Sequence, residues 1–118
     1  PTGICSSVNG DYVYLCDFDS EAIVPIRTSD NLVQTAVSVG SGPIGITAVP
    51  NGSIAYVSCC LEVRAHIVDL GIASMVSYLP VGIRPNGLCV LPSGEFLYVC
   101  NTSSCTVSIF GYSDLEYH

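Results

Sequence analysis

The sequence predicts an all-β protein made of consecutive β-propeller blades. Three observations lead to this prediction: a repeat of 42 residues, short apolar runs separated by turn residues, and the absence of helical periodicity. Four tracks of identical residues keep the same step: Pro1, Pro43 and Pro85; Gly3, Gly45 and Gly87; Gly10, Gly52 and Gly94; Tyr14, Tyr56 and Tyr98. Four tracks in one register indicate a single structural unit that is written three times.

Each complete unit is expected to hold four antiparallel strands. In the second unit the strands are expected over 45–49, 54–58, 64–68 and 75–81, and Asn51-Gly52 forms the first hairpin turn because both residues tolerate positive φ. The first unit has its third and fourth strands over 22–26 and 33–39, and the third unit has its third strand over 106–110. Pro25 removes a ladder donor from the third strand of the first unit, which predicts a bulge or a frayed strand there.

The predicted organisation is one partial propeller of about three blades. Blade 1 spans residues 1–42, blade 2 spans 43–84, and a truncated blade 3 spans 85–118 and stops where its fourth strand should begin. Closed propellers have about four to eight blades, so the outermost blade faces and the last strand need a cover. Three arrangements are left open: a ring closed by two or more copies, a piece of a longer propeller, and an open arc. A homo-oligomer is the expected partner arrangement.

Composition narrows the classes of partner. Hydrophobic residues make up 49% of the chain and charged residues 11%, which indicates a folded domain. Gly, Pro, Ser and Asn interrupt every apolar run well before the roughly 18 residues of a membrane helix, so no membrane span is expected. Ten acidic and three basic residues give a net charge of -7, which argues against nucleic acid as a partner. Because the first residue is Pro1, we expect a processed chain or an excised piece.

One segment carries a family resemblance. Tyr98-Val-Cys-Asn101, followed by Val107-Ser-Ile109, resembles the strand pattern of the YVTN family of β-propeller repeats, and Val39-Gly40 and Val81-Gly82 match its blade junction. The first unit departs from the pattern at Tyr14-Leu-Cys-Asp17. The resemblance implies propeller blades over essentially the whole chain. YVTN-like repeats are also similar to those of lactonase-type propellers, but no active-site motif of that kind is present to carry over.

The candidate ligand-binding residues are Asp17, Asp19, Glu21 and Asn101. In propellers, the loops between second and third strands share one end with the blade junctions, and ligands generally bind there, so this end is expected to present these four residues. Three carboxylates in one loop could hold a cation, but the Gly and the bidentate Glu of a calcium loop are missing. A solvated acidic loop is therefore the favoured interpretation, and neither a metal nor a cofactor is expected.

Seven cysteines leave at least one unpaired in an oxidising compartment. Cys5 aligns with Cys89 and Cys16 with Cys100, at strand positions that favour packing as small apolar side chains. Cys100 and Cys105 flank a four-residue turn and are expected to lie opposite one another, as the one plausible disulfide.

No catalytic residue is assigned. His66 and His118 are the only histidines, the first within a strand and the second at the chain end, and no nucleophile lies at a spacing that would join either in a triad. The sequence therefore favours a non-catalytic binding or protein-interaction scaffold that completes a ring by self-association and takes a protein or small-molecule ligand. A lactonase-like or other hydrolytic enzyme and a purely structural assembly protein are the alternatives.

Overall fold

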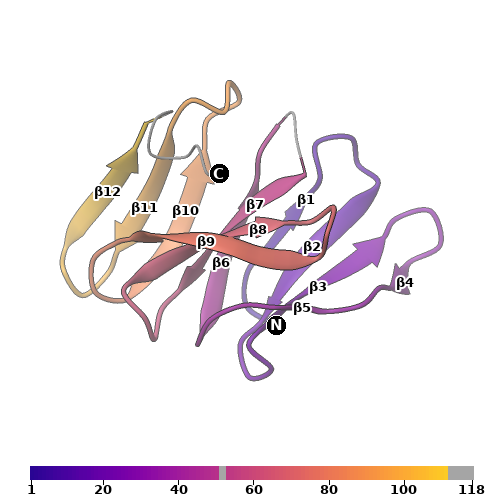
Figure 1. Ribbon diagram of the computed structural model, residues 1–118, viewed down its shortest axis with the longest axis horizontal. Coiled ribbons are helices and arrows are strands. Elements are labelled where there is room, and N and C mark those ends of the chain that lie inside the picture. The colour runs from indigo at the N-terminus through magenta and orange to yellow at the C-terminus, as the bar shows by residue number, and fades with distance from the viewer. Residues whose placement is uncertain (51–52, 112–118) are drawn as a thin grey trace.

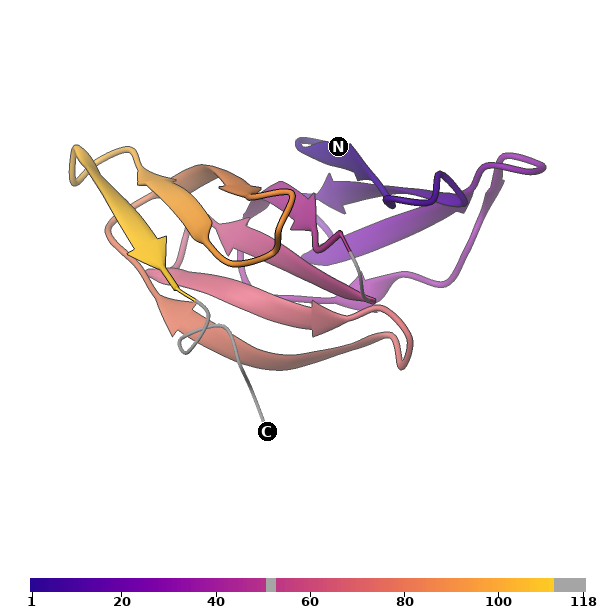
Figure 2. The same ribbon diagram turned by 90° about the horizontal axis from the view of Figure 1, so that it is seen from above.

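The computed structural model describes residues 1–50 and 53–111, and these residues form three antiparallel β-sheets without a helix. Sheet 1 contains β1 (Ile4–Ser6), β2 (Tyr12–Asp17), β3 (Ala22–Arg27), β4 (Leu32–Val33) and β5 (Val37–Ser38). Sheet 2 contains β6 (Pro43–Ala48), β7 (Ile54–Cys59), β8 (Arg64–Asp69) and β9 (Ser74–Pro80). Sheet 3 contains β10 (Pro85–Val90), β11 (Leu97–Asn101) and β12 (Thr106–Phe110). The three sheets stand side by side in chain order (Figure 1), and Figure 2 shows them from above.

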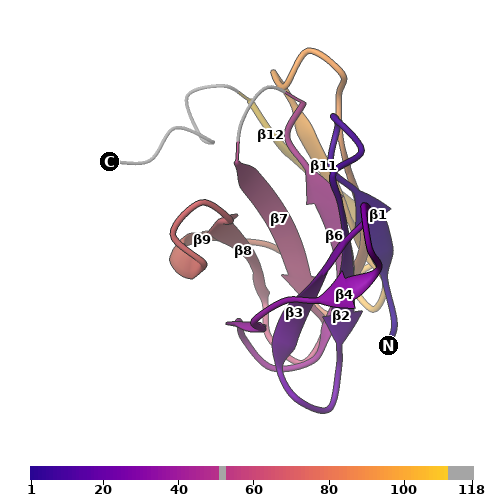
Figure 3. The ribbon, with the colours of Figure 1, turned by 90° about the vertical axis from the view of Figure 1, so that its right-hand side faces the viewer.

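The sheets are consecutive propeller blades, as the repeat predicts. Within each sheet the strands follow one another in sequence order, and the aligned tyrosines pair alike: Tyr14 with Cys5, and Tyr98 with Cys89. The first strands of neighbouring sheets contact one another, β1 with β6 and β6 with β10. Figure 3 shows β1 and β6 at one side of the molecule and β9 at the other. This is a partial propeller with its first strands along the inner edge.

The glycine track at residues 3, 45 and 87 is explained by this inner edge. A Cβ atom at Gly3 would overlap the carbonyl group of Ile44, and one at Gly45 would overlap the carbonyl oxygen of Asn86. At Gly87 nothing lies within 4 Å of the added atom, because no described segment follows on that side. Glycine is therefore required at the two positions where one first strand approaches the next.

Hydrogen bonds also cross between the sheets at the inner edge. The Thr2 hydroxyl donates to the carbonyl oxygen of Pro43 at 2.9 Å, and the Ser58 hydroxyl donates to that of Asn86. Each bond joins one sheet to the first strand of the next. The inner edge is therefore held by directed polar contacts as well as by close packing.

Two hydrophobic clusters fill the spaces between the sheets. The first joins Tyr14, Cys16 and Ile23 of sheet 1 to sheet 2, and the second joins Tyr56 and Ile67 of sheet 2 to sheet 3. The tyrosine track therefore forms core in the first two blades, where Tyr14 and Tyr56 are 7% and 4% exposed. Tyr98, the third member, is 38% exposed. Sheet 2 is thus the one described sheet that is covered on both faces.

The fourth strand of sheet 1 differs from the expectation. We expected one strand over 33–39, but the structure divides it into β4 and β5, which pair separately with the two ends of β3. The register of β2 with β3 is continuous past Pro25, so the proline frays the fourth strand rather than the third. Because Pro25 has no N–H to donate, only its carbonyl oxygen takes part here, accepting from Gln34 N at 2.8 Å.

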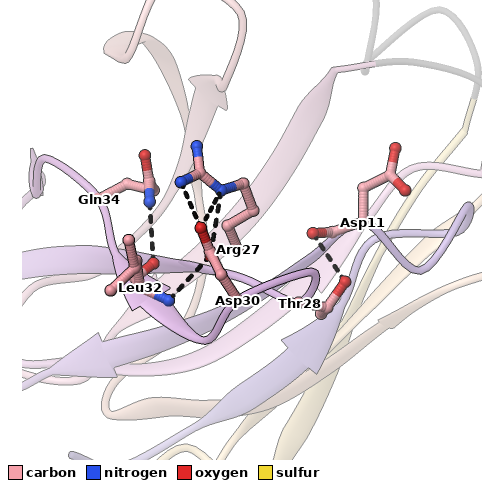
Figure 4. Close-up of polar contacts among 6 residues, drawn as sticks. All are labelled: Asp11, Arg27, Thr28, Asp30, Leu32 and Gln34. Atoms are coloured by element: carbon pink, nitrogen blue, oxygen red, sulfur yellow. Dashed lines mark hydrogen bonds and ion pairs between the residues drawn. The ribbon is translucent and has the colours of Figure 1, made fainter.

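Side-chain contacts fix the turn that leads into β4 (Figure 4). Arg27 Nη2 lies 2.6 Å from Asp30 Oδ2, and Asp30 Oδ1 accepts from Leu32 N at 3.2 Å. The Thr28 hydroxyl donates to the carbonyl oxygen of Asp11, and the Gln34 side-chain nitrogen donates to that of Leu32. The turn before the strand break is therefore held by several side chains.

A matched pair of substitutions tests the blade packing. Ile67 is 2% exposed between sheets 2 and 3, whereas Ile109, one repeat later, is 58% exposed on sheet 3. We expect Ile67→Ala to lower the free energy of unfolding by roughly 2–5 kcal/mol, because it opens a cavity in the core. Ile109→Ala should lower it by under about 1 kcal/mol in dilute monomer, measured by denaturant unfolding. Equal losses in the two variants would contradict the repeat-symmetric packing.

Candidate functional site

The loops and junctions that the sequence analysis singled out lie together at one end of the molecule. We call this the junction end: it holds the loops 18–21, 60–63 and 102–105 and the blade junctions 39–42 and 81–84. Backbone hydrogen bonds tie each junction to the loop of the next blade, from Cys60 N to Gly42 O at 2.8 Å and from Thr102 N to Arg84 O at 2.9 Å. The loops are therefore parts of the blade connections as well as surface.

Two of the three candidate carboxylates come together there. Asp19 and Glu21 line a small hollow of about 320 Å³, whose other walls include Ser41 and Leu61. The Ser41 hydroxyl donates to Glu21 Oε2 at 2.7 Å. Asp17 ends β2 and follows Cys16, which packs toward sheet 2, so alternation along the strand places Asp17 on the opposite face. In the described part of the chain no three His, Cys, Asp or Glu side chains converge as metal ligands.

Asn101 requires a correction. It was expected to contact a ligand, but it is 2% exposed and its amide is engaged within the fold. Its Oδ1 accepts from Gly82 N at 3.0 Å, and its Nδ2 donates to Ser108 Oγ at 2.9 Å. A Cβ at Gly82 would lie 2.7 Å from Asn101 Cγ, so the glycine is needed for this approach. Asn101 holds the junction between blades 2 and 3.

A different pair holds the junction between blades 1 and 2. Glu62 Oε2 accepts from Ser41 N at 2.7 Å, and Glu62 Oε1 lies 2.8 Å from His66 Nε2. A Cβ at Gly40 would lie 2.5 Å from both side chains. Desolvation raises the pKa of Glu62, but the hydrogen bonds from Ser41 and His66 and the charges of His66 and Arg64 outweigh it and leave the pKa below its ordinary value.

Sequence reasoning missed this pair because it treated Glu62 as a loop residue and His66 as a strand residue. The signal available was the repeat itself. His66 aligns with Ser108, and each of them bonds to the side chain that accepts a backbone N–H from a blade junction. Different residues thus bind the backbone at the two blade junctions.

The expected Cys100–Cys105 bridge is also corrected. The register pairs Cys100 with Val107 and Asn101 with Thr106, so Cys105 lies in the turn, with φ of 56°, rather than opposite Cys100. All seven cysteines, which lie within the described residues, are free thiols. Burial raises the pKa of Cys16 to about 11 and that of Cys59 to about 12, so these thiols stay protonated at neutral pH.

The packing role expected for the aligned cysteines is realised in blade 1 alone. Cys16 is buried between sheets 1 and 2, whereas Cys100, its equivalent two repeats later, is exposed on sheet 3. Among the remaining candidates, His118 and the Asn51-Gly52 turn lie outside the described residues.

A hollow larger than the one at the junction end lies at the other end of the molecule. This cavity, of about 730 Å³, sits between sheets 1 and 2, where the chain turns between first and second strands. Tyr12, Tyr14, Pro25 and Gln34 line it from sheet 1. This hollow was not predicted from the sequence, in which Pro25 was the available signal.

The junction end does not bring Ser41 and His66 together as a catalytic pair. The Ser41 hydroxyl is bonded to Glu21, while His66 is bonded to Glu62 and is 4% exposed. A serine nucleophile would need the histidine within hydrogen-bond reach of its hydroxyl. The polar side chains of this end are therefore arranged to bind backbone and one another. Within the described residues, no helix could cross a membrane.

The pKa of Glu62 predicts how acid affects stability. Because the folded state holds that pKa below the ordinary value of 4.5, Glu62 adds stability above pH 4.5 and loses it as the pH falls further. Glu62→Gln should be less stable than the parent chain at pH 7, and the difference in free energy of unfolding should shrink below pH 4.5. Glu95→Gln, which removes an exposed carboxylate from a turn, is the control. A difference that stays constant from pH 7 to pH 3 would contradict the role of Glu62.

Comparison with known proteins supports the fold and goes no further. Hydrazine synthase from Kuenenia stuttgartiensis superposes with a TM-score of 0.91 at 19% identity, over 96% of this chain and 33% of that one. A putative 6-phosphogluconolactonase from Bacteroides fragilis NCTC 9343 gives 0.78 at 22% identity, over 92% of this chain and 33% of that one. No family model and no curated protein matches the chain. The chain thus spans about a third of the solved chains it resembles, and it shares with them the propeller fold.

Proposed function

We propose that this chain is a non-catalytic interaction scaffold whose two uncovered blade faces bind further blades, with a second copy of the chain closing the ring. One observation carries the proposal. Tyr98, Val107 and Ile109 are exposed on sheet 3, at the repeat positions that Tyr56, Ala65 and Ile67 occupy in the buried interface between sheets 2 and 3. The uncovered face of sheet 3 therefore has the composition of a blade interface.

The opposite face of sheet 1 has the matching composition. Ile4 is exposed there, and Val13, Leu15 and Ile26 are half-buried. Their equivalents one repeat later are Ile46, Ala55, Val57 and Val68, which pack against sheet 1 in the first cluster. Joining sheet 3 of one copy to sheet 1 of another would repeat the contact that already exists twice within the chain. Two copies would supply six blades, within the range of about four to eight for closed propellers.

Exposed apolar side chains gathered on one sheet face favour association with another surface. Soluble monomers rarely expose contiguous apolar patches beyond a few hundred Å². A contact between different faces of identical chains forms a ring when the rotation closes. The rotation that relates one blade to the next could relate one copy to the next in the same way, because successive sheets are turned relative to one another (Figure 2).

Self-association is tested by measuring mass in solution. We expect two chains per particle by light scattering at micromolar concentration. Ile109→Asp should return one chain per particle, because it would bury an unpaired carboxylate in the contact. Ile72→Asp changes an exposed isoleucine of a blade 2 turn and should leave the mass unchanged. Monomeric parent protein at every concentration would overturn the second copy as the occupant.

Thiol labelling provides an independent measurement on the same protein. Cys100 and Cys89 lie on the uncovered face of sheet 3, whereas Cys105 lies in a junction-end loop. Association should protect Cys89 and Cys100 from alkylation while Cys105 keeps reacting. Protection that is absent when the mass shows an oligomer would mean that another surface makes the contact.

The junction end is the proposed site for a further partner. Asp17, Asp19 and Glu21 supply three of the ten acidic residues of a chain with net charge -7, so the partner is expected to be positively charged. The proposal keeps Asp19 as the contact residue, gives Glu21 the shared role of binding Ser41, and leaves Asp17 at the margin of the sheet 1 face that the second copy covers. Asn101 serves in the framework beneath them.

Charge removal at this end should weaken capture of a cationic partner. We expect Asp19→Ala to lower the affinity for a lysine-rich peptide about threefold at low salt, with less effect at about 0.5 M salt. Asp11→Ala removes a carboxylate from the opposite end and is the control. Titration with a labelled peptide measures the affinity. Equal effects of the substitutions at the two ends would mean that the peptide responds to the net charge of the chain and not to the junction end.

A lactonase-like hydrolase is the second candidate, suggested by the likeness to the putative 6-phosphogluconolactonase from Bacteroides fragilis. The chain contains three basic residues, Arg27, Arg64 and Arg84, and Arg27 is paired with Asp30. Arg64 lies over the ring of Tyr78 at 4.2 Å. A phosphorylated lactone would therefore find little positive charge here, and the scaffold is the better supported function.

A further inference from the structure

The cavity between sheets 1 and 2 has the size of a small-molecule site. Its volume of about 730 Å³ falls within the roughly 300–1,000 Å³ typical of ligand pockets. Sheet 1 contributes Tyr12, Tyr14 and Gln34, and sheet 2 contributes Ser53 and Leu70. Both walls belong to one chain, so the cavity exists whether or not the propeller ring is closed by other copies.

A local departure from the repeat creates this space. Pro25 lines the cavity, and its equivalent one repeat later is Ile67, which is buried in the cluster between sheets 2 and 3. The short proline ring fills less of the space between blades than the isoleucine side chain does. The break between β4 and β5 withdraws the fourth strand at the same level, and Gln34 and Thr35 in that break line the cavity. The cavity is therefore specific to blade 1.

The lining carries no charge. All sixteen described residues around the cavity are uncharged, in a chain that has ten acidic and three basic residues. A charged ligand would lose hydration in this hollow without gaining an ionic partner, which is costly. The lining therefore favours an uncharged ligand.

Two tyrosine rings form one wall. The centroids of Tyr12 and Tyr14 are 6.1 Å apart and their planes differ by 19°, so the rings present roughly parallel surfaces. Within the described residues, neither phenol hydroxyl has a hydrogen-bond partner. Because no fully buried side-chain oxygen of these residues lacks a partner, both hydroxyls must be accessible to solvent or to a ligand. Desolvation, followed by the charges of Tyr12 and Cys5, raises the pKa of Tyr14, so its hydroxyl remains a donor at neutral pH.

Further polar groups surround the rings. The Gln34 side-chain nitrogen is bonded to the carbonyl oxygen of Leu32 at 2.8 Å, and its oxygen points away from that contact (Figure 4). Thr35 adds a hydroxyl in the strand break. Aromatic surface with hydroxyl and amide groups around it matches ligands that combine a ring with hydroxyls.

We propose that the cavity between sheets 1 and 2 is a binding site for an uncharged, hydroxylated ring, the chemistry shared by neutral saccharides and uncharged polyphenols. The ring face lies against Tyr12 and Tyr14, and the ligand hydroxyls bond to the phenols, Thr35 and the Gln34 oxygen. This site is distinct from the acidic junction end and from the uncovered blade faces. Its occupation does not depend on self-association.

The experiment titrates the intact chain with defined probes. Neutral disaccharides and catechin test the two sources, and glucuronate and glucose 6-phosphate test the exclusion of charge. Binding is followed by saturation-transfer NMR and calorimetry. We expect saturable binding of at least one neutral probe and binding of the anionic probes at least tenfold weaker. No saturable binding of any neutral probe, or equal binding of the anionic ones, would overturn the proposal.

Repeat-matched variants locate the binding. Tyr14→Phe keeps the buried ring and removes the hydroxyl, so it should weaken binding about threefold to tenfold. Tyr98→Phe makes the same change at the equivalent position of blade 3, outside the cavity, and should have no effect. Thr35→Phe places a ring in the cavity from an exposed position and should reduce binding at least tenfold while leaving the unfolding midpoint within about 2 °C. Equal effects of Tyr14→Phe and Tyr98→Phe would place the ligand elsewhere and overturn the assignment.

Discussion

Burial of one sheet face against the next is the interaction on which this structure depends. A single four-stranded sheet has two apolar faces, and here each internal face is covered by the neighbouring blade through Tyr14 or Tyr56 and the residues around them. The close approach is possible because Gly3 and Gly45 leave room for the carbonyl groups of the next first strand. Hydrophobic burial supplies the drive, and the glycines permit the distance at which it acts.

The repeat made much of this architecture predictable. Four residue tracks at one period identified the blade unit, and the structure buries the members of the tyrosine track in blades 1 and 2. Repeats are predictable in this way because each unit meets the same neighbour through the same face. Where that neighbour is missing from the described residues, the same residue has a different environment, as Tyr98 shows.

The candidate site was less predictable, because its details depend on side-chain direction and register. Asn101 was identified as a ligand-binding residue from its loop position, but its amide turns inward to Gly82. The predicted Cys100–Cys105 pairing was wrong because the hairpin register places Val107, rather than Cys105, opposite Cys100. Glu62 and His66 meet across a turn, and a pattern of residue types contains no information on that contact. The cavity beside Pro25 depends on the break between β4 and β5. From the sequence, Pro25 was expected to disturb its own strand, the third of blade 1, rather than the fourth.

The two junctions illustrate how a repeat protein can diverge without losing its fold. Glycine is retained at Gly40 and Gly82, because in each case the blade connection passes directly over a polar side chain. The side chain beneath it can change, since a carboxylate and an amide oxygen both accept the backbone N–H. Neutral Asn101 and ionisable Glu62 therefore do equivalent structural work, and only the second makes its junction sensitive to acid.

Enclosure of sheet 2 on both faces has a consequence for how the molecule opens. Sheets 1 and 3 each contact one described neighbour, so either can separate while the remaining pair stays packed. Loss of structure can then proceed from the flanks toward the middle, and the amides of β7 and β8 exchange last with solvent deuterium. Transient detachment of blade 1 also moves the wall formed by Tyr12 and Tyr14 away from the wall that sheet 2 contributes, so the cavity widens whenever blade 1 opens.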